Sequence, residues 1–174
     1  MGKIYCNPPF KPGAHMGVNY EIWQKCEPGH LAKDVGFQGI KWGTTGTSSG
    51  TPVYFMESGT VVSSKNNCPH CSDRNNCPQG ANNVIVKGND GYYTEYAHVT
   101  PINFAPGTKV KAGQQVGWVD DSGITSGAHV HIARFAPNDD DALYFERPIC
   151  DWNIYGVDTL TLSRDCHRSP ILRP

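Results

Sequence analysis

The chain has 174 residues, of which 38% are hydrophobic, 10% aromatic and 18% charged. This length suits one domain, alone or with extensions, and the composition is that of a soluble globular protein. A net charge of −1 excludes a global positive field, so we expect no binding to nucleic acid or anionic membranes. No apolar run approaches the ~20 residues that span a bilayer, and we expect no transmembrane segment.

Residues 1–28 are rich in Pro, Gly and Asn and have no sustained period. We expect an ordered N-terminal extension that packs on or near the core and is tied down by a disulfide. Its first residues lack the apolar stretch of a secretory signal. Either a signal has been removed or export uses another route, and a phage-type release would need none.

Between residues 29 and 136, short β-rich runs alternate with turn residues. Residues 51–64 indicate a strand, a Ser-Gly turn and a second strand, and residues 82–99 indicate a hairpin around Asn-Asp-Gly. Residues 127–135, GAHVHIARF, alternate strictly and predict another strand, whereas no window has a helical stripe. The expected fold class is mainly β, with short antiparallel strands joined by tight turns.

Two segments lie outside this pattern. Residues 63–81 are polar and Cys-rich, and we interpret them as a loop inserted into a hairpin of the core. Residues 137–174 form a C-terminal extension that begins with an acidic loop and contains one expected strand, VDTLTLS, at 157–163. We expect a disulfide to hold this extension as well.

Seven cysteines are many for a cytosolic chain of this length, and they favour an oxidising compartment with several disulfides. We expect Cys6–Cys26 and Cys150–Cys166 bonds, because each pair brackets a segment outside the core. The odd number leaves at least one thiol unpaired or bonded to another chain. The three cysteines of the insertion can form disulfides or, with a nearby histidine, a structural zinc site; these residues are Cys68, His70, Cys71 and Cys77.

Five residues form the strongest candidate site. His129 and His131 are two positions apart in a predicted strand and therefore share a face. His30 precedes Asp34 by four residues, which again places both on one side of the chain. His98 ends a strand in which Thr94 and Tyr96 would share its face. Imidazole and carboxylate ligands suit Zn²⁺, and three of them leave a fourth position for the water of a catalytic site.

The motifs occur in an order that resembles the lysostaphin-like zinc endopeptidases, the M23 peptidase family. They are HLAKD (30–34), GTPVYFMESGTVV (50–62), YAH (96–98), VKAGQQVG (110–117) and SGAHVH (126–131). The resemblance spans about residues 29–136 and implies an antiparallel β domain with a narrow groove. It also implies an enzyme that cuts peptides in bacterial peptidoglycan.

By this resemblance His30, Asp34 and His131 are the zinc ligands, and His98 and His129 are the two active-site histidines that bind no metal. One of these two takes a proton from the attacking water and the other stabilises the oxyanion. We favour His129 as the base, since it lies next to a ligand on the same strand face.

Tyr96 and Asn82 are weaker candidates for substrate binding in the groove. Ordinary packing is at least as plausible for the tyrosine. The chain departs from the family pattern at Ala32, where glycine is common, and at Ala128, where proline is common. The 63–81 insertion is the largest departure, and we expect it to border the groove and to affect substrate choice.

The expected function is zinc-dependent hydrolysis of a stem peptide or cross-bridge, with small residues such as Gly or Ala at the cut. The expected partner is bacterial peptidoglycan, the location is extracellular or the cell wall, and the protein is a monomer. The alternative is a catalytically inactive relative that serves as a binding or regulatory module. A lipoyl-like carrier would explain GTKVKAGQQVG (107–117) but none of the histidines.

Overall fold

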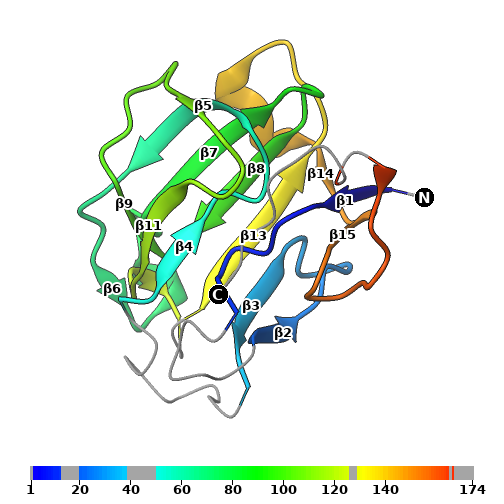
Figure 1. Ribbon diagram of the computed structural model, residues 1–174. Helices are drawn as coiled ribbons and strands as arrows, with labels where there is room; N and C mark the ends of the chain where they lie inside the picture. Colours follow the sequence, from blue (N-terminus) through cyan, green and yellow to red (C-terminus); the bar gives the residue numbers. More distant parts are fainter. Residues whose placement is uncertain (1, 13–19, 39–49, 126–128, 165, 167–174) are drawn as a thin grey trace.

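A computed structural model describes residues 2–12, 20–38, 50–125, 129–164 and 166 (Figure 1). Their regular structure is β, apart from two short 3₁₀ helices, η1 (Arg74–Asn76) and η2 (Asp141–Glu146). The predicted fold class, mainly antiparallel β with short strands, is confirmed. No helix among these residues has the length and apolar character needed to cross a membrane.

The largest sheet is antiparallel and carries the predicted strand of GAHVHIARF near its middle. Its strands, in spatial order, are β10 (Lys109–Val110), β5 (Gly59–Lys65), β7 (Asn83–Gly88), β8 (Tyr93–Ala97), β13 (Val130–Phe135), β3 (Lys33–Phe37) and β2 (Tyr20–Gln24), and β14 (Pro148–Ile149) pairs with the end of β13. The predicted hairpin is β7–β8, and Gly91 at its turn has a φ of 83°, which glycine adopts without a steric cost.

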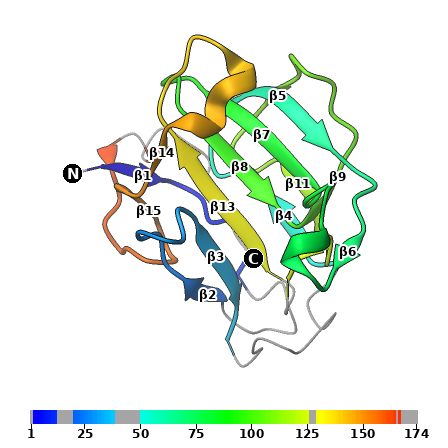
Figure 2. The same ribbon diagram turned by 180° about the vertical axis from the view of Figure 1, so that it is seen from behind.

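A second antiparallel sheet lies across one face of the first (Figures 1 and 2). It consists of β4 (Pro52–Tyr54), β11 (Gln115–Val119) and β9 (Val99–Pro101). The core fills the space between the sheets: Val53 and Val116 of the small sheet join Val84 and Ile132 of the large one in a single buried cluster. The two strands predicted in residues 51–64 therefore exist, but they lie in different sheets and do not pair with each other.

The two ends of the described chain lie side by side. Strand β1 (Lys3–Tyr5) pairs in parallel with β15 (Trp152–Ile154), and the disulfides follow from this contact. They are Cys6–Cys166 and Cys26–Cys150. The predicted pairs were wrong, because each bond joins one extension to the other. The expected strand at 157–163 was also wrong; only an isolated bridge between Tyr155 and Thr159 forms there.

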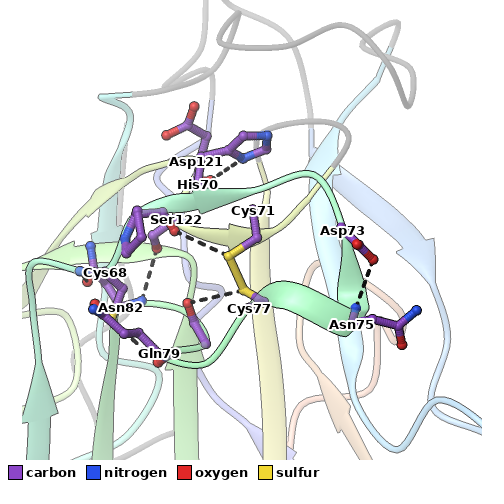
Figure 3. The surroundings of a disulfide bond; sticks show 12 residues. Cys68, His70, Cys71, Asp73, Asn75, Cys77, Gln79, Asn82, Asp121 and Ser122 are labelled. Atoms are coloured by element: carbon purple, nitrogen blue, oxygen red, sulfur yellow. Dashed lines mark hydrogen bonds between the residues drawn. A yellow bond between two sulfur atoms is a disulfide. The ribbon is translucent and has the colours of Figure 1, made fainter.

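The Cys-rich segment between β5 and β7 is tied to the rest of the fold by a short parallel pair. Strand β6 (His70–Cys71) pairs with β12 (Gly123–Ile124), which precedes β13 in the chain. A disulfide joins Cys71 to Cys77, and Cys68 remains a buried free thiol (Figure 3). The alternative of a structural zinc in this segment was therefore wrong, since two of its proposed ligands are consumed by the disulfide.

Candidate active site

Four histidines and one aspartate lie together at one end of the large sheet, and we refer to His30, Asp34, His98, His129 and His131 as the histidine–aspartate cluster. Strand pairing brings them together: His131 of β13 is opposite Asp34 of β3 on one side and Ala97 of β8 on the other. Because paired residues face the same side of a sheet, Asp34 and His131 meet directly. Nδ1 of His131 lies 2.8 Å from Oδ1 of Asp34.

His30 reaches the cluster from the turn that precedes β3. The backbone amides and carbonyls of His30 and Glu27 form two reciprocal hydrogen bonds, which fix the turn. Nε2 of His30 lies 3.3 Å from Oδ2 of Asp34, and its ring is 5.4 Å from the ring of His131, edge to face. The predicted four-residue spacing thus places both side chains on the same side.

His129 precedes β13 and is buried beside Asp34. Its Nε2 lies 3.4 Å from Oδ1 of Asp34, and its Nδ1 lies 3.4 Å from the hydroxyl oxygen of Thr125. The ring packs 5.8 Å from the ring of Trp23. Because successive side chains of a strand alternate, Val130 and Ile132 lie on the opposite face, where they are fully buried in the core behind the histidines.

His98 occupies the position between β8 and β9 and has a φ of 61°, in the left-handed region. Few residues other than glycine adopt this conformation, and histidine is among the more tolerant ones. It turns the His98 side chain to the face opposite Tyr96, so that the His98 ring lies 5.0 Å from His129 and 5.9 Å from His131. The expectation that Thr94 and Tyr96 share the face of His98 was wrong for this reason.

The backbone carbonyl of Ser122 fixes the His98 imidazole. Nδ1 of His98 lies 2.7 Å from this oxygen, and because a carbonyl can only accept, the proton is on Nδ1 and Nε2 is left as an acceptor. Burial is the largest influence on the His98 imidazole and lowers its pKa to about 4, with a further contribution from the charge of His129. His98 is therefore neutral at pH 7.

Asp120 holds Ser122 in place and was not anticipated from the sequence. One carboxylate oxygen accepts from the Ser122 amide at 2.8 Å and from its hydroxyl at 2.5 Å. The other oxygen accepts from Asn82 Nδ2 at 2.9 Å and from the Thr100 hydroxyl at 2.8 Å. In the sequence Asp120 is one of two adjacent aspartates after a strand, and nothing there separates it from a solvated turn.

The structure brings neither the Asn82 nor the Tyr96 side chain into the cluster. Asn82 is buried; its side-chain oxygen accepts from the Cys68 amide, and its carbonyl accepts from the His98 amide at 3.0 Å. Tyr96 is fully buried in the core, where its hydroxyl accepts from the Met56 amide at 2.8 Å. These positions suit support of His98 and packing, respectively, rather than the substrate contacts expected for both.

The donor atoms fit a metal ion in two overlapping ways. Those of His30, Asp34 and His131 all lie within 4.8 Å of one another, and so do those of His98, His129 and His131. Two ligand atoms of a tetrahedral zinc are about 3.4 Å apart, close to the 3.3 Å between His30 Nε2 and Asp34 Oδ2. The first set also supplies a carboxylate, whose negative charge offsets part of a divalent cation.

The protonation of Asp34 and His131 reflects their close contact. Burial raises the pKa of the Asp34 carboxyl, but hydrogen bonds from His129 and His131 outweigh this and hold it well below its ordinary value. Burial lowers the pKa of the His131 imidazole, but the hydrogen bond and the charge of Asp34 raise it above its ordinary value. Asp34 is therefore an anion throughout the neutral range, as a metal ligand must be.

A cavity of about 670 Å³ opens onto the cluster. Gln24 of β2 and Gly29 of the turn before β3 line it, together with Arg74, Cys77 and Ala81 of the Cys-rich segment. The cluster thus lies at the base of an open groove, and the Cys-rich segment borders that groove. Arg74 was not singled out from the sequence, because a single arginine in a polar loop carries no distinguishing signal.

Comparison with known proteins shows that the region containing this site is similar to a known protein family. Residues 38–140 match the family model described as Peptidase family M23. The match includes His98, His129 and His131 and begins after His30 and Asp34.

Curated relatives include the peptidoglycan DD-endopeptidase ShyA of Vibrio cholerae, which is 33% identical over 82 residues, covering 47% of this chain and 17% of ShyA. The glycyl-glycine endopeptidase ALE-1 of Staphylococcus capitis is 30% identical over 82 residues, covering 47% of this chain and 23% of ALE-1. The aligned segment is therefore less than a quarter of either relative.

Among solved structures, the catalytic domain of a mutant of the prophage-encoded M23 protein EnpA from Enterococcus faecalis has a similar fold. The TM-score is 0.52 at 23% identity, over 80% of this chain and 93% of that domain. The family match extends over more than half of the chain and agrees with the order of the sequence motifs. The chain belongs to peptidase family M23.

Proposed function

We propose that the protein is a zinc-dependent endopeptidase that hydrolyses peptide bonds in bacterial peptidoglycan. The observation that supports this most directly is the meeting of His30, Asp34 and His131 at the base of a groove, with two further histidines beside them. The names of the relatives support the substrate: one is a peptidoglycan DD-endopeptidase and another a glycyl-glycine endopeptidase.

In this proposal His30, Asp34 and His131 hold the zinc. When bound, a zinc ion of this kind polarises a carbonyl oxygen and lowers the pKa of a water molecule toward ~7. The anionic state of Asp34 favours binding of the cation at neutral pH. Val130 and Ile132 anchor the strand that carries His131 in the core, and the His131 ring contacts Asp34 at 2.8 Å, so these two ligands already lie together.

The hydrogen bonds favour His98 as the general base, in place of His129. Nε2 of His98 is an unprotonated acceptor because Nδ1 donates to the Ser122 carbonyl, and its lowered pKa keeps it neutral at pH 7. Nε2 of His129 lies 3.4 Å from Oδ1 of Asp34, so this nitrogen already faces a carboxylate. His98 then removes a proton from the attacking water, and His129 donates to the developing oxyanion.

The disulfides support a location for this activity, and the groove supports a preference at the cut bond. Three disulfides join described cysteines, which suits an extracellular or cell-wall location. Small residues such as Gly or Ala at the cut would fit a groove bordered closely by the Cys-rich segment. We propose a monomer as the active form. The alternative of an inactive binding module is not favoured, since the predicted residues are present and lie together.

The test is digestion of purified peptidoglycans of several chemotypes, followed by mass spectrometry of the released fragments. The proposal expects new amino and carboxyl termini at one defined bond, their loss with a chelator and their return with added zinc. If no chemotype yields new termini with the zinc-loaded protein, the chain is not a peptidoglycan endopeptidase. Cleavage that continues unchanged in chelator would instead exclude the metal.

A further inference from the structure

A disulfide and several hydrogen bonds hold the Cys-rich segment in place (Figure 3). The Cys71–Cys77 disulfide closes a loop around η1, and the Asp73 carboxylate accepts from the Asn75 amide at 2.9 Å to start this helix. Outside the loop, His70 Nδ1 donates to the Asp121 carbonyl at 2.8 Å, and β6 pairs with β12. A side chain on η1 is therefore presented to the groove from a fixed backbone.

Arg74 is that side chain. It is exposed and lines the same cavity as the histidine–aspartate cluster. Within the described part of the chain it has no hydrogen bond or ion pair, although exposed arginines commonly find a carboxylate nearby. Its guanidinium carries a permanent charge and a planar set of donors that match a carboxylate in a bidentate contact.

Among the described residues that line the cavity, none offers Arg74 an unengaged anion. Among the described residues that line the cavity, Asp34 is the one acidic side chain, and it is already engaged by three histidines of the cluster. No other lysine or arginine lies among those lining residues. The groove thus has one anionic centre at its base and one unengaged cation at its rim.

We propose that Arg74 is an anion subsite that binds a carboxylate of the substrate peptide near the scissile bond. The inference rests on the proposed function and makes it more specific. It selects acidic stem peptides, whose glutamate and diamino-acid residues carry free carboxylates, over neutral glycine cross-bridges. The Cys71–Cys77 disulfide contributes by constraining the backbone from which the Arg74 side chain extends.

The test measures peptide binding and cleavage separately. The probes are the soluble tetrapeptide L-Ala-D-Glu-diaminopimelate-D-Ala and its two forms with a carboxamide at glutamate or at diaminopimelate. Binding is measured by calorimetry with the zinc-loaded H98N protein, alone and combined with R74Q, R74K or K109Q. Lys109 is an exposed cation of β10 outside the cavity, so K109Q is a control for the change in net charge.

We expect the free tetrapeptide to bind about tenfold or more tightly than one of the amidated forms, the range of a charge-assisted hydrogen bond. R74Q should remove this preference without weakening the amidated form, R74K should keep part of it, and K109Q should keep all of it. Equal affinities for all three peptides, or a preference that survives R74Q, would overturn the subsite.

Cleavage distinguishes this inference from the proposed function. A carboxylate preference in binding that depends on Arg74, together with no peptidoglycan cleavage by the wild-type protein, would keep the subsite and reject the endopeptidase. Peptidoglycan cleavage without an Arg74-dependent carboxylate preference in binding would keep the endopeptidase and reject the subsite.

Discussion

Strand β13 carries a polar group on each face, and the two groups have different surroundings. At its start His131, with His129 just before the strand, faces Asp34, His30 and His98 at the base of an open groove. Toward its end Arg134 points to the opposite face and is buried. Nη1 of Arg134 contacts the Tyr5 hydroxyl at 3.1 Å.

The Arg134 group is balanced in charge. Nη2 of Arg134 donates to Asp90 at 3.0 Å, and Glu57 lies 3.9 Å from Nη1. Lys3 approaches Glu57 at 3.3 Å, and the Thr94 hydroxyl donates to Glu57 at 2.9 Å. Two cations therefore face two carboxylates, although a cavity of about 340 Å³ adjoins them.

The comparison teaches how to separate a functional polar cluster from a structural one. In the Arg134 group each charge meets an opposite charge, so removal of Arg134 leaves Lys3 as the one cation beside the two carboxylates of Glu57 and Asp90. In the histidine–aspartate cluster several nitrogen donors surround a single carboxylate, a composition that suits a cation supplied from outside. The first group should control stability, and the second should control activity.

The largest expected effect is on activity and comes from Asp34. Asp34→Asn keeps the shape of the side chain and removes the charge that offsets the metal. We expect loss of wall hydrolysis by more than about 10³-fold, since metal affinity and catalysis both depend on this ligand. The measurement is release of soluble wall fragments at saturating zinc. Glu27→Gln, on the nearby turn, is the control and should retain full activity.

His98→Asn tests the histidine that binds no metal in our assignment. Asparagine tolerates the left-handed φ of 61° at this position better than alanine does, so the backbone should be kept. We expect kcat to fall by about 10²- to 10⁴-fold, the usual contribution of a general base, with zinc still bound. An active His98→Asn enzyme would remove His98 from the mechanism.

Arg134→Met is the corresponding change in the structural group. Methionine has a similar length but no charge, so Asp90 and Glu57 lose their buried cation and share the half-exposed Lys3. We expect the free energy of unfolding to fall by about 3–5 kcal/mol, measured by denaturant titration, with unchanged activity per folded molecule. Arg147→Met, on the exposed loop that follows, is the control. A stable Arg134→Met protein without activity would contradict the division between the two groups.

Asp120→Asn should have a smaller effect on activity. Its carboxylate holds Ser122, whose carbonyl orients His98, and a displaced catalytic group commonly costs about 10- to 100-fold in rate. We expect kcat to fall while KM stays the same, because the groove is unchanged. Asp121→Asn alters the exposed neighbouring aspartate and should be neutral. A rise in KM with kcat unchanged would mean that Asp120 acts on substrate binding.

The smallest expected effect is on acid stability. Burial raises the pKa of Asp90, but the Arg134 hydrogen bond, the Tyr92 amide and the nearby cations outweigh this and lower it below its ordinary value. Its stabilisation is therefore present above the unfolded pKa of about 3.9 and is lost as the pH falls toward the folded pKa. Burial raises the pKa of Glu57, which acts in the opposite direction.

To isolate the contribution of Asp90 to acid stability, we would compare the thermal melting midpoints of wild type and Asp90→Asn at pH 6 and at pH 3. We expect the wild-type midpoint to fall more between the two values than that of the variant. Parallel curves would mean that the Asp90–Arg134 contact does not depend on ionisation.

Much of the fold follows from local patterns in the sequence. Asn-Asp-Gly between β-rich runs specifies the β7–β8 hairpin, and the strict alternation around His131 specifies both the strand and the face of its histidines. The meeting of His131 with Asp34 needs only the pairing of β13 with β3. For these features the local backbone preference and the tertiary packing agree.

The remaining features depend on contacts between distant segments. The left-handed conformation of His98 moves its side chain away from the face of Tyr96, and no period in the sequence reveals it. The disulfides depend on the two extensions lying side by side, which cysteine spacing does not encode. Asp120 acquires its place through the fold of the loop that holds Ser122.

Zinc content tests the central claim most directly, because two overlapping sets of ligands share His131. We would measure zinc per chain by mass spectrometry for wild type, Asp34→Asn and His98→Asn after the same zinc loading and desalting. The account predicts one zinc in wild type and His98→Asn and none in Asp34→Asn. Zinc retained in Asp34→Asn but lost in His98→Asn would place the metal between His98, His129 and His131 and contradict the account.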